Sequence, residues 1–102
     1  MQEITTDSLK RRMDQGDDLN IIDVREPNER EEFNIGGKHI PLGRFRNDDI
    51  DELDELKDQE VIVYCRSGNR SGQAALILES KGFTNVNNLV GGMKKWQENF
   101  DK

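Results

Sequence analysis

The sequence predicts an α/β fold in which helices cover both faces of a small parallel β-sheet. Strand-like and helix-like segments alternate along the chain, and this alternation is typical of right-handed βαβ units. The clearest strand, Val61–Tyr64, is apolar on both of its faces. Because a strand with two apolar faces must be covered on both sides, we expect this segment at the centre of the sheet.

Five segments have the apolar or β-branched character of strands. In chain order they are residues 4–5, 20–24, 39–42, 61–64 and 86–90. The third is the weakest of them, because Pro41 cannot donate a hydrogen bond to a neighbouring strand. In parallel α/β sheets ligands bind beyond the carboxyl ends of the strands, so we look for the functional site there.

Helices are expected between these strands, over residues 8–15, 27–34, 48–56 and 70–81 and after residue 92. Thr6 or Asp7 can cap the first of them, and Pro27 suits the first turn of the second. Gly16 and Gly82 follow two of the expected helices, at a position where glycine is favoured.

Length and composition indicate one globular domain over residues 1–102. A chain of 102 residues leaves no room for a second core. Charged residues make up 35% of the chain and apolar residues 32%, a balance that approaches the composition of disordered chains. The apolar residues are nevertheless gathered into short runs between turn residues, and this pattern favours a packed core.

Charge and cysteine content narrow the classes of partner and compartment. With a formal net charge of −6, the chain is a poor binder of nucleic acid and of anionic membrane surfaces, and we expect neither partner. No apolar stretch approaches the ~20 residues that span a bilayer, and we expect no secretion signal. The single cysteine excludes an internal disulfide, so a reducing cytoplasm fits best.

The segment after the central strand carries the chemistry of the chain. It reads Cys65, Arg66, Ser67, Gly68, Asn69, Arg70 and Ser71, with no apolar residue after the cysteine. A turn from strand to helix can direct several backbone N–H groups at one point, and Gly68 and Asn69 tolerate the positive φ that this requires. The helix dipole adds positive charge at the same place, and so do Arg66 and Arg70, unless one of the two points outward.

A thiol at the first position of this loop is favoured as its anion. The thiolate is the nucleophilic form of cysteine, and the same N–H groups would stabilise an anionic substrate or a persulfide. No histidine base is then required, and the only histidine, His39, lies in a different loop. A lone cysteine at the end of a strand is ordinarily a small core residue, but the six polar or glycine residues after Cys65 favour a reactive one.

Four motifs in chain order make the sequence resemble the rhodanese-type sulfurtransferases. They are Ile-Asp-Val-Arg-Glu-Pro at 22–27, His-Ile-Pro at 39–41, Cys-x-x-x-x-Arg-Ser at 65–71 and Gly-Gly-Met-Lys-Lys-Trp at 91–96. Each motif alone is weak. Together, in the order of the family, they span nearly all of the chain.

The resemblance implies a parallel five-stranded sheet flanked by helices and a sulfur-transfer reaction. By this resemblance Cys65 takes a sulfane sulfur from a donor such as thiosulfate, becomes a persulfide, and passes the sulfur to cyanide or a thiol. The backbone of Arg66, Ser67, Gly68, Asn69 and Arg70 would cradle the sulfur, and the two arginines would bind the anionic donor. A cysteine desulfurase or a thioredoxin-like protein is a partner by analogy. No cofactor is implied, and no second Cys or His offers a metal set.

Three departures from the family concern one rim of the expected pocket. Arg30 stands where the family commonly has Phe or Tyr, residues 33–38 form a longer stretch than usual, and Leu42-Gly43 replaces the common Gly-Ala. The cysteine loop is intact, so these changes bear on the choice of donor and acceptor.

Other conspicuous residues are expected to be structural. For Asp23 and Arg25, which end a strand, we expect an ion pair or a cap, and Arg25 pointing into the pocket is the alternative. His39 is expected to be a hydrogen-bonded loop residue, and Trp96 a core residue. The acidic residues 48–55 are expected to form a solvated helix face, with a docking surface for a basic partner as the alternative.

Two further functions stay open on the sequence alone. Phosphatases and arsenate reductases on related folds have five residues between the cysteine and the arginine. Here Cys65 and Arg70 are separated by four residues, so a phosphoryl group should fit poorly. A non-enzymatic interaction module is the other alternative, because a fold does not fix a function.

Overall fold

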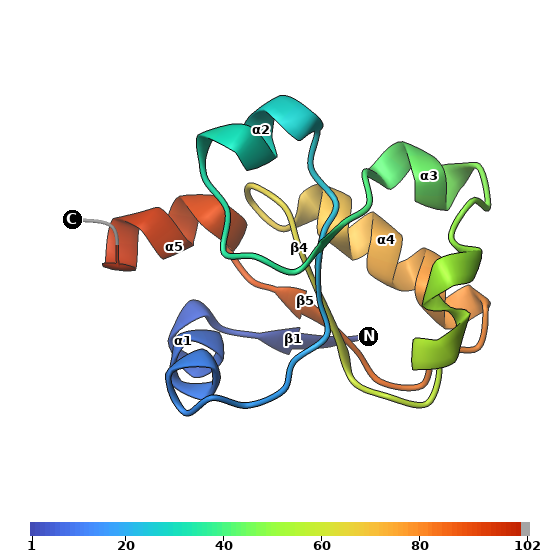
Figure 1. The fold of residues 1–102 in the computed structure, drawn as a ribbon, viewed down its shortest axis with the longest axis horizontal. Coiled ribbons are helices and arrows are strands. Elements are labelled where there is room, and N and C mark those ends of the chain that lie inside the picture. The colour runs from blue at the N-terminus through green and yellow to red at the C-terminus, as the bar shows by residue number, and fades with distance from the viewer. Residues whose placement is uncertain (101–102) are drawn as a thin grey trace.

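The computed structural model describes residues 1–100, in which five strands form one sheet. Figure 1 shows the helices arranged around it. The strands are β1 (Gln2–Ile4), β2 (Ile21–Asp23), β3 (Lys38–His39), β4 (Val61–Tyr64) and β5 (Val86–Leu89). They lie in the order β1-β5-β4-β2-β3, and every neighbouring pair is parallel. The predicted fold class is therefore confirmed, with β4 as the central strand.

Helices cover both faces of this sheet. They are α1 (Thr6–Asp14), α2 (Pro27–Glu32), α3 (Leu42–Arg46), the 3-10 helix η1 (Asp51–Leu56), α4 (Asn69–Ser80) and α5 (Gly92–Phe100). Helices α1 and α5 pack on one face, whereas α3, η1 and α4 pack on the other (Figure 1). The short helix α2 buries none of its residues and lies beside the loop that follows β4.

The alternation of side chains along β4 explains the two apolar layers. Val61 and Val63 belong to the layer under α4, whereas Ile62 and Tyr64 belong to the layer under α5. All four side chains are fully buried. Because a shift of one residue would exchange the two layers, packing on both faces fixes the register of the strand that leads to the cysteine loop.

The predicted strand over residues 39–42 is largely wrong. The observed β3 contains only Lys38 and His39, and Pro41 instead precedes helix α3. This helix has five residues and buries Leu42 and Phe45. A helix of this length repeats its apolar pattern too few times to be recognised in a sequence.

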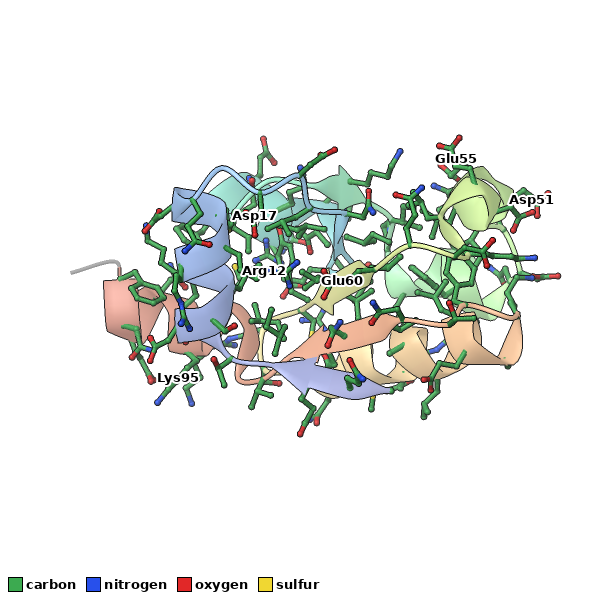
Figure 2. The ribbon with its side chains drawn as sticks, turned by 90° about the horizontal axis from the view of Figure 1, so that it is seen from below. Arg12, Asp17, Asp51, Glu55, Glu60 and Lys95 are labelled. Carbon is green, nitrogen blue, oxygen red and sulfur yellow. The ribbon has the colours of Figure 1, made fainter. Side chains whose placement is uncertain are left out.

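The predicted helix over residues 48–56 is wrong in its start and in its type. Asp48 has a φ of 56°, a left-handed conformation that no right-handed helix contains. The chain then forms η1, where Leu53 and Leu56 are buried and share one face because side chains three residues apart eclipse in a 3-10 helix. Its acidic residues are exposed, and Figure 2 shows Asp51 and Glu55 pointing outward, which confirms the solvated face.

The first strand and helix begin earlier than the sequence indicates. Strand β1 covers residues 2–4, because Thr5 is already the N-cap of α1 and its hydroxyl accepts a hydrogen bond from Ser8 N–H at 3.1 Å. The predicted caps, Thr6 and Asp7, lie inside the helix. The other elements match their predicted places to within two residues.

Candidate active site

Residues 65–68 join β4 to α4, and together with residues 69–71 in the first turn of α4 they form the cysteine loop around the sulfur of Cys65. The residue is only 1% exposed and is part of the apolar layer under α4. Its Sγ nevertheless accepts a hydrogen bond from Gly68 N–H at 3.0 Å, and the Ser71 hydroxyl lies 3.3 Å from it. Gly68 has a φ of 108°, a conformation that side chains rarely adopt, so the turn requires glycine here.

Several backbone donors of this loop have no protein acceptor. Within residues 1–100, the N–H groups of Arg66, Asn69 and Arg70 make no hydrogen bond to another residue. The last two belong to the first turn of α4, where helix geometry leaves donors without partners. Donors of this kind bind water or an anion, and the helix dipole favours the anion.

The start of α5 holds the loop from behind. Met93 N–H donates to the carbonyl of Cys65 at 2.9 Å, and Lys94 N–H donates to that of Arg66 at 2.9 Å. Gly92 has a φ of 54°, and a Cβ at this position would lie 2.6 Å from the carbonyl carbon and oxygen of Arg66. This close approach of two backbones gives the second glycine of the Gly-Gly motif its physical reason.

Opposing effects set the protonation of Cys65. Burial raises the pKa of the thiol, whereas the Ser71 hydroxyl and the backbone N–H groups of Ser71, Gly68 and Ser67 lower it. The balance is a pKa below the ordinary value of a thiol. The thiolate, which is the nucleophile, is therefore favoured by the loop as the sequence predicts.

Asn88 of β5 is a site residue that sequence reasoning missed. It is 6% exposed, and its Nδ2 donates to the carbonyl of Gly68 at 3.0 Å. Its Oδ1 accepts a hydrogen bond from Ser71 Oγ at 2.5 Å. The only signal in the sequence is an asparagine inside a buried strand, because a buried amide must find hydrogen-bond partners.

Arg70, which the family resemblance implies as a binder of the donor, is paired with a carboxylate of α2. Its guanidinium makes two hydrogen bonds to the carboxylate of Glu29 on α2, with N–O distances of 2.6 and 2.8 Å. These hydrogen bonds lower the pKa of Glu29 to about 2 against the opposing effect of burial. The positive charge of Arg70 is therefore already shared with a carboxylate before any donor arrives.

Arg66 is exposed and lines a cavity of about 330 Å³ between α2 and α5. The rest of the lining is Arg25, Glu29, Glu32, Phe33, Met93 and Gln97. Among the described residues Arg66 makes no ion pair, so its charge is available to a donor. Ser67 and Asn69 are also exposed and lie on another side of the loop, where they line a separate cavity of about 410 Å³.

A buried ion pair stabilises the end of β2. Asp23 is fully buried and Arg25 is 4% exposed, and two hydrogen bonds of 2.9 Å join their side chains. Burial raises the pKa of Asp23, but the hydrogen bonds from Arg25 bring it below its ordinary value. The expected structural pair is confirmed, and the edge of Arg25 that remains exposed borders the cavity beside Arg66.

Two of the departures from the family are explained together. Arg30 donates to the carbonyl of Gly37 at 2.8 Å and lies 3.4 Å from Asp23. The hydroxyl of Tyr64 donates to the carbonyl of Gly36 at 3.0 Å. Arg30 thus ties the longer stretch over residues 33–38 to the end of the sheet.

His39 is hydrogen-bonded as expected, because its Nε2 lies 2.7 Å from the carbonyl oxygen of Arg25, but it ends strand β3 and does not lie in a loop. Within the described part of the chain, no three His, Cys, Asp or Glu residues come together as metal ligands. None of the helices found over residues 1–100 is long and apolar enough to cross a membrane.

The fold and the loop define a class of protein: a parallel α/β domain that presents one cysteine to a set of backbone donors. Residues 5–99 match the family described as "Rhodanese-like domain". The chain belongs to this family, as its four motifs predict.

Relatives and solved structures agree with this assignment. "Putative sulfur carrier protein YrkF" of Bacillus subtilis is 41% identical over 95 residues, which are 92% of this chain and 50% of YrkF. "Putative sulfurtransferase YtwF" of the same species is 39% identical over 100 residues, with 95% and 91% covered. The chain therefore spans about half the length of YrkF and nearly all of YtwF. A rhodanese-like domain protein from Staphylococcus aureus superposes with a TM-score of 0.81 at 30% identity, covering 94% of this chain and 91% of that one.

Proposed function

We propose that this chain is a sulfurtransferase or persulfide carrier of the thiosulfate type. Cys65 accepts a sulfane sulfur from thiosulfate or from a protein persulfide and passes it to cyanide or to a thiol. The observation that carries the proposal is the position of Sγ, 3.0 Å from Gly68 N–H in a loop whose neighbouring donors have no acceptor within residues 1–100. Such donors stabilise an anionic sulfur without a histidine base. The names of YrkF and YtwF support the same class of reaction.

The proposed step forms one sulfur–sulfur bond and breaks another. The thiolate of Cys65 attacks the outer sulfur of thiosulfate, and sulfite leaves with the electron pair of the broken bond. Three negative charges are present before the step and three after it. The charge of the protein moves one atom outward, onto the terminal sulfur of a persulfide. This is the anion that we assign to the N–H groups of Arg66, Asn69 and Arg70.

The second step regenerates the thiolate. Cyanide or an external thiolate attacks the terminal sulfur, and Cys65 leaves with the electron pair. The lowered pKa of Cys65 makes its thiolate a better leaving group. The chain has one cysteine, so it cannot resolve its own persulfide as an internal disulfide and needs an external acceptor.

The two arginines have different parts in this proposal. Arg66, which is exposed and has no ion pair within residues 1–100, attracts the anionic donor to the mouth of the loop. Arg70, held by Glu29 at 2.6 Å, keeps α2 and the loop together and offers the donor only part of its charge. A phosphatase reaction is disfavoured by the length of the loop, because four residues separate Cys65 from Arg70 where the related phosphatases have five.

We further propose that one domain over residues 1–102 carries this activity in the cytoplasm. A cysteine desulfurase as donor or a thioredoxin-like protein as acceptor suits a single exchangeable sulfur on one thiol. Neither nucleic acid nor a membrane is proposed as a partner, because the net charge of the chain is −6.

The test is an intact-mass measurement before and after incubation with thiosulfate in the absence of reductant. We expect the wild-type chain to gain the mass of one sulfur atom and the Cys65→Ser variant to gain nothing. Cyanide should then remove the added mass. If neither thiosulfate nor a protein persulfide adds sulfur to the folded wild type, the proposal is wrong and a binding module becomes the better account.

A further inference from the structure

The hydroxyl of Ser71 has two acceptors and one hydrogen. Its Oγ lies 2.5 Å from Oδ1 of Asn88 and 3.3 Å from Sγ of Cys65. Because a hydroxyl donates one hydrogen bond, it cannot serve both acceptors at once. Ser71 is fully buried, so bulk water does not replace whichever partner is lost. The shorter contact places the hydrogen on the side of Asn88.

The orientation of the Asn88 amide is fixed by a different contact. Its Nδ2 donates to the carbonyl oxygen of Gly68 at 3.0 Å, and a carbonyl can only accept. Oδ1 must therefore face Ser71, and since this oxygen is also an acceptor, the hydrogen between them belongs to the hydroxyl. Asn88 thus competes with Cys65 for the hydrogen of Ser71.

We propose that Asn88 is a positioning residue that holds the hydrogen of Ser71 and releases it to the sulfur only while Cys65 is a thiolate. When Cys65 is a neutral thiol, its S–H points at the hydroxyl oxygen, and the hydroxyl donates to Asn88. When the thiolate forms, the hydroxyl turns to Sγ and leaves Oδ1 without its donor. The free thiolate therefore carries a cost that Asn88 imposes.

The loaded state removes this cost. This step rests on the proposed function, because it concerns the persulfide. In the persulfide the negative charge lies on the terminal sulfur, and Sγ becomes a neutral, weak acceptor. The hydroxyl then returns to Asn88. Asn88 thus favours the persulfide over the free thiolate, and its effect on both states passes through Ser71.

The test is the rate of Cys65 alkylation by iodoacetamide as a function of pH, with five variants. Asn88→Ala frees the hydroxyl for the sulfur, so below the pKa of Cys65 the alkylation rate should rise about fivefold. Ser71→Ala removes the donor and should slow the same reaction about fivefold. The double variant should follow Ser71→Ala to within about twofold.

Asn87→Ala is the matched control among the five variants. Asn87 is the preceding residue of β5, has the same 6% exposure as Asn88, and donates instead to Glu60 at 3.0 Å. Its removal should lower stability without moving the pH profile of Cys65. A change of profile in Asn87→Ala would mean that any loss of a buried amide suffices, which contradicts the inference.

Asn88→Asp is a second variant at this position, with a side chain of nearly the same shape as asparagine. It should change the alkylation rate in the direction opposite to Asn88→Ala. The carboxylate holds the hydroxyl more strongly and places a like charge near the sulfur, so alkylation should become slower than in the wild type. This arm decides the matter if Asn88→Ala does not fold. Slower alkylation in Asn88→Ala, faster alkylation in Asn88→Asp, or an Asn88→Ala acceleration that persists after Ser71→Ala would each overturn the inference.

Sulfur loading separates this inference from the proposed function. At equilibrium with limiting thiosulfate and added sulfite, at a pH above the pKa of Cys65, the ratio of persulfide to free thiolate should be about fivefold lower in Asn88→Ala than in the wild type. An unchanged ratio in a wild type that does load sulfur would overturn the inference alone. A wild type that never loads sulfur would overturn the proposed function, while the alkylation arm would still decide which group holds the hydrogen.

Discussion

The two ends of strands β4 and β5 both carry polar groups, and they differ in how those groups are satisfied. Near the amino ends, Arg12 of α1 pairs with Glu60 at 3.0 Å, and Asn87 donates to the same carboxylate at 3.0 Å (Figure 2). At the carboxyl end, the N–H groups of Arg66 and Asn69 have no acceptor within residues 1–100. The first cluster is satisfied within the protein, whereas the second keeps unpaired backbone donors, which we propose to hold an anion.

The largest effect is expected from a substitution that displaces the cysteine loop at the carboxyl end of β4. A Gly92→Ala variant places a Cβ 2.6 Å from the Arg66 carbonyl and must displace the cysteine loop. We expect sulfur loading by thiosulfate to fall at least about a hundredfold and stability to fall by about 2–4 kcal/mol. Single-turnover loading and urea unfolding measure the two quantities.

Gly43→Ala is the control for this variant. Gly43 lies in helix α3 with nothing within 4 Å of a Cβ, and its φ is not positive. A change of about 1 kcal/mol or less in stability and an unchanged loading rate are expected there. Equal losses of stability and loading rate in both variants would mean that displacement of the cysteine loop is not the cause.

Removal of the ion pair between Arg12 and Glu60, near the amino ends of β4 and β5, should lower stability without changing sulfur transfer. The hydrogen bond from Arg12 lowers the pKa of Glu60, although burial raises it. A carboxylate whose pKa is lower in the folded than in the unfolded chain stabilises the fold above its ordinary pKa and loses that effect as the pH falls. Arg12→Met should therefore cost about 1 kcal/mol at neutral pH, and the difference from wild type should vanish in acid.

Urea unfolding across this pH range tests the prediction, with sulfur loading as the second readout. The folded Arg12→Met variant should load sulfur at the wild-type rate. A loading rate that fell together with the free energy of unfolding would mean that the two ends of the strands are coupled, and this would contradict the comparison.

A smaller effect is expected at Glu29 and Arg70, where a paired side chain lies next to the unpaired backbone donors of the cysteine loop. Glu29→Gln removes the carboxylate that shares the charge of Arg70, so the KM for thiosulfate should fall about threefold with little change in kcat. Because the pKa of Glu29 is about 2, the pair is intact at every pH above ~4, and the difference should not depend on pH there.

Glu32→Gln controls for the charge alone. Glu32 lies on the same helix and lines the same cavity, but within the described residues it forms no ion pair with Arg70. A KM change of equal size in both glutamate variants would mean that general repulsion of the donor, and not the release of Arg70, is responsible.

The smallest effect is expected on the acidic face of η1. Asp51 and Glu55 are exposed and lie on the outside of the molecule (Figure 2). Changing both to their amides should leave thiosulfate kinetics unchanged and alter stability by less than about 0.5 kcal/mol. A slower reaction of the double variant with a basic protein partner only, measured at low salt, would favour the docking alternative.

The fold and the cysteine loop could be predicted because their signals are local. Val61–Tyr64 shows two apolar faces, and the run of polar residues after Cys65 follows at once in the sequence. The candidate site residues are therefore predictable because they directly follow one clear strand in the sequence. The expectation for Trp96 is also confirmed, since the side chain is 6% exposed in the layer under α5.

The parts that escaped prediction depend on contacts between distant residues. Glu29 and Arg70 are 41 positions apart, and Ser71 and Asn88 are 17 apart. No property of either member alone indicates its partner. Helix α3 escaped because it has only five residues, and Asp48 escaped because it ends that helix in a left-handed conformation that is usually taken by glycine. Its N–H donates to the carbonyl of Phe45 at 3.2 Å, and the next N–H donates to the carbonyl of Arg44 at 2.8 Å.

The central claim is that the open donors of the cysteine loop receive a transferred sulfur at Cys65. The most direct test is a single turnover with thiosulfate labelled only at its outer sulfur, followed by removal of free donor and addition of cyanide. The account predicts label on the wild-type chain, none on Cys65→Ser, and release of one labelled thiocyanate for each loaded Cys65. Label that stays in solution, or that binds Cys65→Ser equally, would contradict it.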